Sequence, residues 1–567
     1  MSTPSTKTQR ALLLQHFLDR FFDSELVSRQ SEARVTLAQI LAALTIPGFV
    51  ISALLITKYA AFAAESSLMA YLAALNDECR FLFFSMVVMG FVTVVEWDTL
   101  FPDRRDFLIL SPLPLSSRTL FTAKVQSLFY FLLLFSAFVN LIPAILFPFI
   151  AGGGSIFFMF RFAFSHVTCV LAGNTFVFLS LIAIQGLLMN LFGPGAFRKI
   201  SRLVQLLLLI FLLTVFFVIP GISFTYLRQN PRALAVFPPA WFLGMHETLL
   251  RGWMTEFAGL ARRALAALAI AGFGFVLTYL VSYRRQLRRI LEGERVGACQ
   301  KPRWRESLGT LIQRVVFHSP GERAVFSFVR RTLFQSEKHR VCLGAYFGVG
   351  MAFVAMGVIT VFARNGYGAV HELRGEFLSI PMVLGFFTLV GMRVVFAFPS
   401  QLGANWIFRI TEQEEKQPYL TGVHKAMFVL GVLPILAIVG PFSFWAWGWR
   451  TAGLHVAFVL VMSLILIEIL LYRLDKIPFT CTYLPGKANL KLMFLPYIFA
   501  FTTYSYTMTT LELRLLKRPA LLVTFVVAAL LVLAASVLRR HRKLKGGKSF
   551  VYDMSPLQVA EPLSLSR

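Results

Sequence analysis

The stretch FSHVTCVLAGNTFVFLSLIAIQGLLMNLF, residues 164–192, decides the fold class of this chain. It contains no Asp, Glu, Lys or Arg. A helix rises about 1.5 Å per residue, so about 20 residues cross a hydrocarbon core of about 30 Å. The stretch is long enough for that, and it therefore predicts a membrane-spanning helix.

Further apolar runs repeat this pattern along the 567 residues. The predicted spans lie roughly at residues 35–57, 80–96, 125–150, 164–192, 203–224, 259–282, 341–362, 377–398, 427–447, 452–472, 492–509 and 519–538. They form two sets of six with a basic stretch between them. The sequence therefore predicts an all-α polytopic membrane protein with about 12 transmembrane helices in two six-helix halves.

Composition and charge point to the same class. The chain is 57% hydrophobic and 15% charged, with a mean hydropathy of +0.70, outside the range typical of water-soluble domains. Its net charge is +27, and most of the 55 Lys and Arg fall on one side if the N-terminus is cytoplasmic. This asymmetry follows the positive-inside rule. We therefore assign the charge to contact with anionic lipid headgroups and not to nucleic acid.

Each predicted half begins with an amphipathic helix. In residues 12–26 the apolar residues at helical spacing are Leu14, Phe17, Leu18 and Phe21. Before the second half, Ser319 is expected to cap a helix, with Pro320 in its first turn and Glu322 reaching back to the cap. We expect both helices to lie in the cytoplasmic interface, and their matching places favour an internal duplication.

A polar cytoplasmic loop follows the second predicted span of each half. In the first loop, residues 97–120, the section LPLSSR at 113–118 ends one short helix and begins the next. In the second loop, residues 399–416, an amphipathic helix precedes an acidic run. Both loops could receive force from a soluble partner, or their helices could merely rest on lipid. The residues that we single out are Asp103, Arg104, Arg105, Leu113, Pro114, Arg118, Asn405, Trp406, Arg409 and Glu414.

This layout resembles the transmembrane domain of ABC exporters of the second class (ABC-2 type). The phrase FLILSPLPLSSRTLF, residues 107–121, continuing to Lys124, is similar to the loop of many bacterial ABC permeases. Residues 236–247 resemble the short outer helices between the fifth and sixth spans of such exporters. The candidate outer gate comprises Pro238, Pro239, Trp241, His246 and Glu247. The second half departs from the pattern, with a short connection around residues 512–518.

The resemblance implies the permease subunit of an ATP-driven exporter. We expect it in the bacterial cytoplasmic (inner) membrane with both termini cytoplasmic, moving a lipid-like or amphipathic substrate. The sequence has no Gly-x-x-x-x-Gly-Lys-Ser/Thr loop. ABC ATP-binding subunits, two in number, should therefore act in trans and carry ATP and Mg²⁺, with no cofactor on this chain. A further membrane subunit or a homodimer remains possible.

The resulting domain prediction has five parts. They are residues 1–34 with the first interfacial helix, 35–282 as the first six-span domain, 283–340 as a basic linker with the second interfacial helix, 341–538 as the second six-span domain, and 539–567 as a basic cytoplasmic tail. Residues 477–487 form a further cytoplasmic segment whose role the sequence does not indicate.

Other classes of function stay open as alternatives. A twelve-span secondary carrier also has two six-span halves, although repeated membrane-embedded acids for proton coupling are not evident in the predicted spans. A polytopic lipid-modifying enzyme and a non-transport scaffold are further alternatives. The pair His246-Glu247 lacks a second His at position 250, which is Leu, so it is no zinc-protease motif.

Polar residues are few in the predicted spans: Asn140, His166, Asn174, Gln185, Asn190, His455 and Glu468. Glu468 is the most unusual, because an ionisable group in a span is costly and tends to mark a function or a pair. It could make a structural contact between helices, line a translocation path or take part in chemistry.

Overall fold

A computed structural model describes most of the chain. The described residues are 6–22, 45–46, 48–60, 67–101, 110, 113, 115–151, 155–218, 224–253, 255–291, 316–400, 405–410, 417–472, 477–480, 497 and 499–544. All regular elements within these ranges are helical, and no strand occurs among them. The chain divides into two compact units, residues 1–299 and 300–567, and the division falls inside the predicted basic linker.

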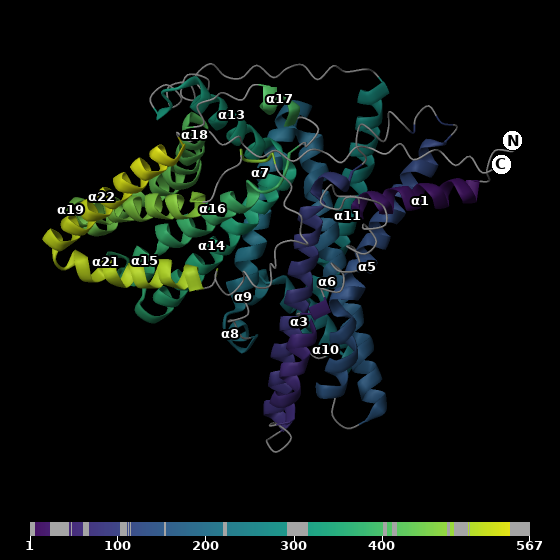
Figure 1. Cartoon of the computed structure of the whole chain (residues 1–567). Coiled ribbons are helices and arrows are strands. Elements are labelled where there is room, and N and C mark those ends of the chain that lie inside the picture. The colour runs from purple at the N-terminus through teal and green to yellow at the C-terminus, as the bar shows by residue number, and fades with distance from the viewer. Residues whose placement is uncertain are drawn as a thin grey trace. The chain divides into compact units, whose positions relative to one another are not determined.

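The first unit is a bundle of long apolar helices with short helices between the last two of them (Figure 1). Its elements are α1 (Thr6–Phe22), α3 (Ser67–Val95), η1 (Trp97–Thr99), α5 (Ser117–Ala151), α6 (Ile156–Leu191), α7 (Pro194–Val218), α8 (Phe224–Gln229), α9 (Pro231–Val236), α10 (Pro238–Arg251) and α11 (Thr255–Leu291). Helix α6 packs against α3, α5 and α11, and α10 packs against α3, α6 and α11.

The two ends of this unit carry different short elements. Helix α1 lies across the beginning of α5, where Leu13 and Phe17 are buried against Leu120 and Ala123. The buried Lys124 of α5 donates to the carbonyl of Thr99 at 2.8 Å, so η1 meets the same end. Helix α10 lies at the opposite end, beside the first half of α3 (Figure 1).

Helix α3 begins earlier than the apolar run from residue 80 predicts. It starts at Ser67, so Asp77 and Glu78 lie inside a helix that is long and apolar enough to cross a membrane. Both carboxylates are buried. The hydropathy pattern placed the boundary too late because it scores charged residues as exposed, whereas these two have partners inside the bundle.

The second unit contains a second helical bundle. Its elements are α13 (Pro320–Gln335), α14 (Glu337–Asn365), η3 (Tyr367–His371), α15 (Gly375–Leu378), α16 (Ile380–Val395), α17 (Asn405–Ile410), α18 (Gln417–Met427), the π-helical turn η5 (Phe428–Val432), α19 (Leu433–Leu471), the π-helical turn η6 (Thr503–Thr507), α21 (Met508–Leu516) and α22 (Pro519–Leu544). Its core is formed chiefly by α13, α16, α18 and α19.

The predicted cap of the second amphipathic helix is confirmed. Ser319 Oγ accepts a hydrogen bond from the Glu322 amide at 3.1 Å, and Glu322 Oε2 accepts one from the His318 amide at 3.0 Å. Val325 and Val329 are buried on the inner face of α13. This face lies close to α18, since a Cβ added at Gly422 would be 3.1 Å from Glu322 Cα.

The chain is an all-α, multi-pass membrane protein. Nine helices among the described residues are long and apolar enough to cross a membrane. One of them, Gln417–Leu471, contains the predicted span 427–447 and all but the last residue of the predicted span 452–472, with Gly448 at a φ of 74° between them. The predicted spans 35–57 and 492–509 lie partly outside the described residues. The count of twelve therefore stays a prediction.

Candidate functional site

The candidate site is a group of buried ionisable residues where α3, α6 and α10 meet. Helix α10 begins with Pro238 and Pro239, which suit the first turn of a helix. It packs tightly on α11, because a Cβ added at Gly244 would clash with the Cβ of Leu260. From α6, Ser165 Oγ donates to the carbonyl of His246 at 2.8 Å, and Arg161 Nε donates to that of Leu249 at 3.1 Å.

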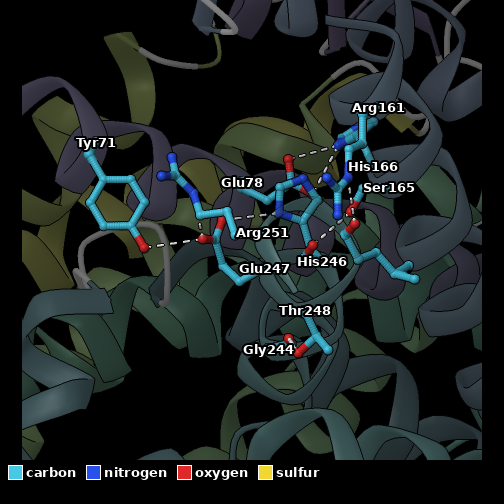
Figure 2. Close-up of polar contacts among 11 residues, drawn as sticks. Tyr71, Glu78, Arg161, Ser165, His166, Gly244, His246, Glu247, Thr248 and Arg251 are labelled. Atoms are coloured by element: carbon cyan, nitrogen blue, oxygen red, sulfur yellow. Dashed lines mark hydrogen bonds and ion pairs between the residues drawn. The ribbon is translucent and has the colours of Figure 1, made fainter. Parts of the chain in front are cut away.

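Four side chains form the centre of the site (Figure 2). Glu78, His166, His246 and Glu247 are all 3% exposed or less. His166 Nδ1 lies 2.9 Å from Glu78 Oε1 and 2.8 Å from Oε2. His246 Nε2 is 3.9 Å from Glu78 Oε1, and His246 Nδ1 is 3.4 Å from Glu247 Oε1. The two imidazoles and two carboxylates thus alternate in space from α6 to α10.

Tyr71 and Arg251 connect this centre to the edge of the bundle (Figure 2). The Tyr71 hydroxyl donates to Glu247 Oε2 at 3.1 Å, and Arg251 Nε is 3.2 Å from the same oxygen. The Arg251 guanidinium also lies 4.4 Å from the centre of the Tyr71 ring. Since the Arg251 side chain is 38% exposed, the group extends from a fully buried interior to a partly open edge.

Aromatic rings enclose the imidazoles. Phe81 and Phe147 present edge-on contacts to His166, with ring centres 6.0 and 6.1 Å away. Phe162 makes a similar contact with His246 at 5.0 Å. These rings exclude water from the charged centre, which raises the energy of any unbalanced charge there.

The neighbouring Asp77 is balanced separately. Lys58 Nζ lies 2.6 Å from its Oδ2, and Arg80 Nη1 lies 3.1 Å from its Oδ1. The Tyr59 hydroxyl donates to the same carboxylate at 3.1 Å. Lys58 and Arg80 therefore balance the charge of Asp77 without a contribution from His166 or His246.

A second group of buried polar residues, all neutral, joins α3, α5 and α6. Asn140 Nδ2 donates to Ser85 Oγ at 2.7 Å, and Ser85 Oγ donates to Asn174 Oδ1 at 3.0 Å. Asn174 Nδ2 also donates to Ser136 Oγ at 2.8 Å. Two of the polar residues noted in the sequence, Asn140 and Asn174, thus belong to one network that joins three helices.

The second unit contains one buried pair of the same type. His455 Nδ1 on α19 lies 2.6 Å from Glu512 Oε1 on α21, and both side chains are at most 1% exposed. Trp447 presents its ring to His455 at 5.4 Å. The pair resembles His166 with Glu78, but no second histidine among the described residues joins it.

No family model, curated protein or solved structure matches this chain. Within the described ranges, no group of three or more His, Cys, Asp or Glu is placed to hold a metal ion.

The structure separates the predicted outer gate into two parts. His246 and Glu247 belong to the buried centre, whereas Pro238 and Pro239 begin α10. Trp241 Nε1 donates to the carbonyl of Ala235 at 3.1 Å, so this ring ties α10 to α9.

The structure describes only some of the residues singled out in the two predicted cytoplasmic loops, where an ATPase would couple to this chain. Leu113, Arg118 and Trp406 are exposed, whereas Asn405 is buried and donates to the carbonyl of Thr480 at 2.6 Å. The Phe479 amide also donates to the carbonyl of Phe396, so residues 477–480 contact both Phe396 and Asn405. Outside the described residues or side chains lie Asp103, Arg104, Arg105, Pro114, Arg409 and Glu414, the segment 481–487 and the tail 545–567.

Glu468 has a histidine neighbour on another helix. Its Oε2 lies 3.3 Å from His424 Nε2 of α18, and its side chain is 18% exposed. The site of α3, α6 and α10 does not include it.

Sequence reasoning missed Glu78, Tyr71 and Arg251 in the first unit and Glu512 in the second. Glu78 lay outside the predicted span, so it was not considered as a partner for His166. A signal was available, because a histidine in an apolar helix requires a buried hydrogen-bond partner. The adjacent Asp77 and Glu78 follow an Ala- and Leu-rich helical segment, which indicates that the helix starts before them and that both are candidate partners.

Proposed function

We propose that this chain is the membrane-spanning permease of an ATP-driven ABC exporter, with twelve spans in two halves. The observation that carries the proposal is the element order of the first unit. An amphipathic helix, α1, packs at one end, and three short helices, α8 to α10, stand between the last two long helices at the other. This order supports the resemblance to ABC-2 permeases on which the proposal depends.

Under this proposal, two ABC ATP-binding subunits bind the cytoplasmic loops in trans and carry ATP and Mg²⁺. The membrane is the bacterial inner membrane, with both termini in the cytoplasm. The substrate is lipid-like or amphipathic and leaves toward the outer side, where α8 to α10 lie. The two units would then rock against one another as the ATPases close and open.

Lys124 offers a route from the first loop to the spans. Its ammonium group binds the Thr99 carbonyl, and Trp97 before it is fully buried with its indole donating to Ser201 Oγ at 2.8 Å. A displacement of this loop would therefore move the start of α5 and of α7 together. In the second unit, the bond from Asn405 to Thr480 would transmit a displacement of α17 in the same way.

Purification of the full chain from its native membrane tests this proposal. A separate ATPase should co-purify, and the complex should hydrolyse Mg-ATP. Trp406→Ala should reduce the amount of bound ATPase, because this exposed ring lies on α17, within the second cytoplasmic loop of residues 399–416. Trp449→Ala is the matched control, since Trp449 is also exposed but follows Gly448 in α19 and does not belong to the predicted loop of residues 399–416. Transport by the isolated chain on a proton gradient alone would contradict the proposal.

A second candidate is a proton-coupled secondary carrier. The buried group of Glu78, His166 and His246 favours it, because ionisable residues inside a membrane bundle often form proton relays. Reconstitution of the chain alone into liposomes separates the two candidates. A carrier would move substrate when a proton gradient is imposed, and uncouplers would stop it, whereas the permease would need its ATPase.

A further inference from the structure

The centre of the first unit carries an unbalanced charge when both its carboxylates are ionised. Glu78 and Glu247 contribute two negative charges, and Arg251 supplies the only arginine or lysine charge that contacts either carboxylate among the described residues. One negative charge is left over. A buried, uncompensated charge costs several kcal/mol, so the arrangement favours one added proton on an imidazole.

The two histidines are placed to share that proton. His166 Nδ1 is within hydrogen-bond distance of both Glu78 oxygens, and His246 lies between the two carboxylates. Within the described part of the chain, His166 Nε2 and both ring nitrogens of His246 have no hydrogen-bond partner, and all three are buried. Of the four ring nitrogens only His166 Nδ1 is hydrogen-bonded to a described residue, so no fixed hydrogen bond determines whether the other three carry a proton.

We propose that Glu78, His166, His246 and Glu247 form a proton-binding site that holds one exchangeable proton on its imidazoles and thereby fixes α10 against α3 and α6. Proton exchange with solvent follows the contacts from His246 to Glu247 and on to Tyr71 at the edge of the bundle. The inference does not depend on whether ATP or an ion gradient drives transport.

The neighbouring acidic groups have cationic partners of their own, whereas Arg161 binds a neutral carbonyl. Asp77 is paired with Lys58 and Arg80, and Glu256 of α11 is paired with Arg228 of α8. Arg161 of α6 donates from its Nε to the carbonyl of Leu249. Tyr59 and Tyr71 donate to Asp77 and Glu247 as neutral phenols. The exchangeable proton is therefore assigned to the imidazoles, because imidazole is the side chain whose ordinary pKa lies closest to neutrality.

The mechanical consequence concerns α10. This helix contributes His246, Glu247 and Arg251, whereas Glu78 and His166 belong to α3 and α6. Loss of the proton would leave a net negative charge at the contact of the three helices. Helix α10 would then separate from α3 more readily, and its backbone amides would become accessible to solvent.

Hydrogen–deuterium exchange of the full chain in lipid nanodiscs tests the proposal. Exchange of the α10 amides is measured between about pH 6 and about pH 9, corrected for the intrinsic pH dependence and compared with α13. In the wild type, corrected exchange of α10 should rise by about tenfold or more with pH, while exchange of α13 stays constant. A flat corrected profile for α10 would overturn the proposal.

Two variants have opposite expected results. Glu247→Gln removes the excess negative charge, so α10 should stay protected at every pH. His166→Gln with His246→Gln removes both proton acceptors, so α10 should exchange fast at every pH. If the double variant does not fold, the wild type and Glu247→Gln still test the proposal. If Glu247 only stabilised the packing of α10, Glu247→Gln would make the α10 amides exchange faster than in the wild type, whereas the proposal expects them to stay protected.

His455→Gln is the matched control, since it alters a buried His–Glu pair in the second unit. It should leave the α10 profile unchanged. If it flattened that profile, the response to pH would not arise at the proposed site, and the proposal would fail.

Discussion

His166 Nδ1 lies within hydrogen-bond distance of both carboxylate oxygens of Glu78, 2.9 Å from Oε1 and 2.8 Å from Oε2. Both side chains are at most 1% exposed. The two residues are 88 positions apart in the chain. Each lies about three turns after the start of its helix, which is Ser67 for α3 and Ile156 for α6. This contact joins two membrane helices through an interaction that neither helix could satisfy alone.

Removal of Glu78 should destabilise the first unit strongly. Glu78→Ala leaves two buried imidazoles without their shared carboxylate, and breaking a buried pair in this way typically costs about 3–5 kcal/mol. Thermal unfolding in detergent should show a clear fall in Tm. Glu256→Gln provides the control, because the Glu256 side chain is 50% exposed and its pair with Arg228 should contribute less than about 1 kcal/mol. Equal shifts for the two variants would contradict the assigned role of Glu78.

Gly244 should tolerate no side chain. A methyl group there would clash with Leu260 Cβ and lie 3.1 Å from the backbone nitrogen of Ala261, so α10 and α11 would have to separate. Gly244→Ala should therefore cost about 1–3 kcal/mol, as overpacking of a core does. Gly259→Ala is the matched variant on α11, since no atom lies within 4 Å of an added Cβ there. It should be neutral or stabilising by up to about 1 kcal/mol, and the two Tm values check this contrast.

The cap of α13 should contribute measurably to the second unit. Ser319→Ala removes the hydrogen bond to the Glu322 amide and should cost about 1 kcal/mol. Ser155→Ala is the control, because Ser155 is the N-cap of α6 but makes no side-chain capping bond. Hydrogen exchange of the first turn of α13 should become faster only in the Ser319 variant. An unchanged rate would show that the cap is dispensable.

The stability of the first unit should fall as the pH rises above neutrality. His246 lies on α10, outside the nine apolar helices, and burial lowers its pKa, but the carboxylates of Glu78 and Glu247 outweigh that effect and raise it above the usual value of about 6.5. A histidine with a raised pKa in the folded state stabilises the fold fully below its ordinary pKa. That contribution is lost as the pH rises through the raised value. The Tm of the wild type should therefore decrease over this range, and that of His246→Gln should depend less on pH.

Much of the fold was accessible from periodicity and composition. The cap at Ser319 was predicted from four consecutive residues, because a capping box depends on local backbone geometry. The apolar runs likewise predicted membrane helices, since length and hydropathy alone decide whether a helix can cross a bilayer. The start of α3 was predicted too late, because hydropathy scores Asp77 as a charged residue and contains no information on its ion pairs with Lys58 and Arg80.

The candidate site was only partly accessible. His246 and Glu247 were selected for their place in an outer loop, and His166 was noted as a polar residue in a span. Nothing in the spacing indicates that these residues share a centre with Glu78, because helix packing brings together positions far apart in the chain.

The sequence by itself determined that this protein is helical and resides in a membrane, because those properties follow from local apolar content and from the need to satisfy backbone hydrogen bonds within each segment. Only the tertiary structure decided which ionisable side chains face one another. Their pairing depends on the contacts among α3, α6, α10 and α11, such as the close approach at Gly244, and no single segment encodes it.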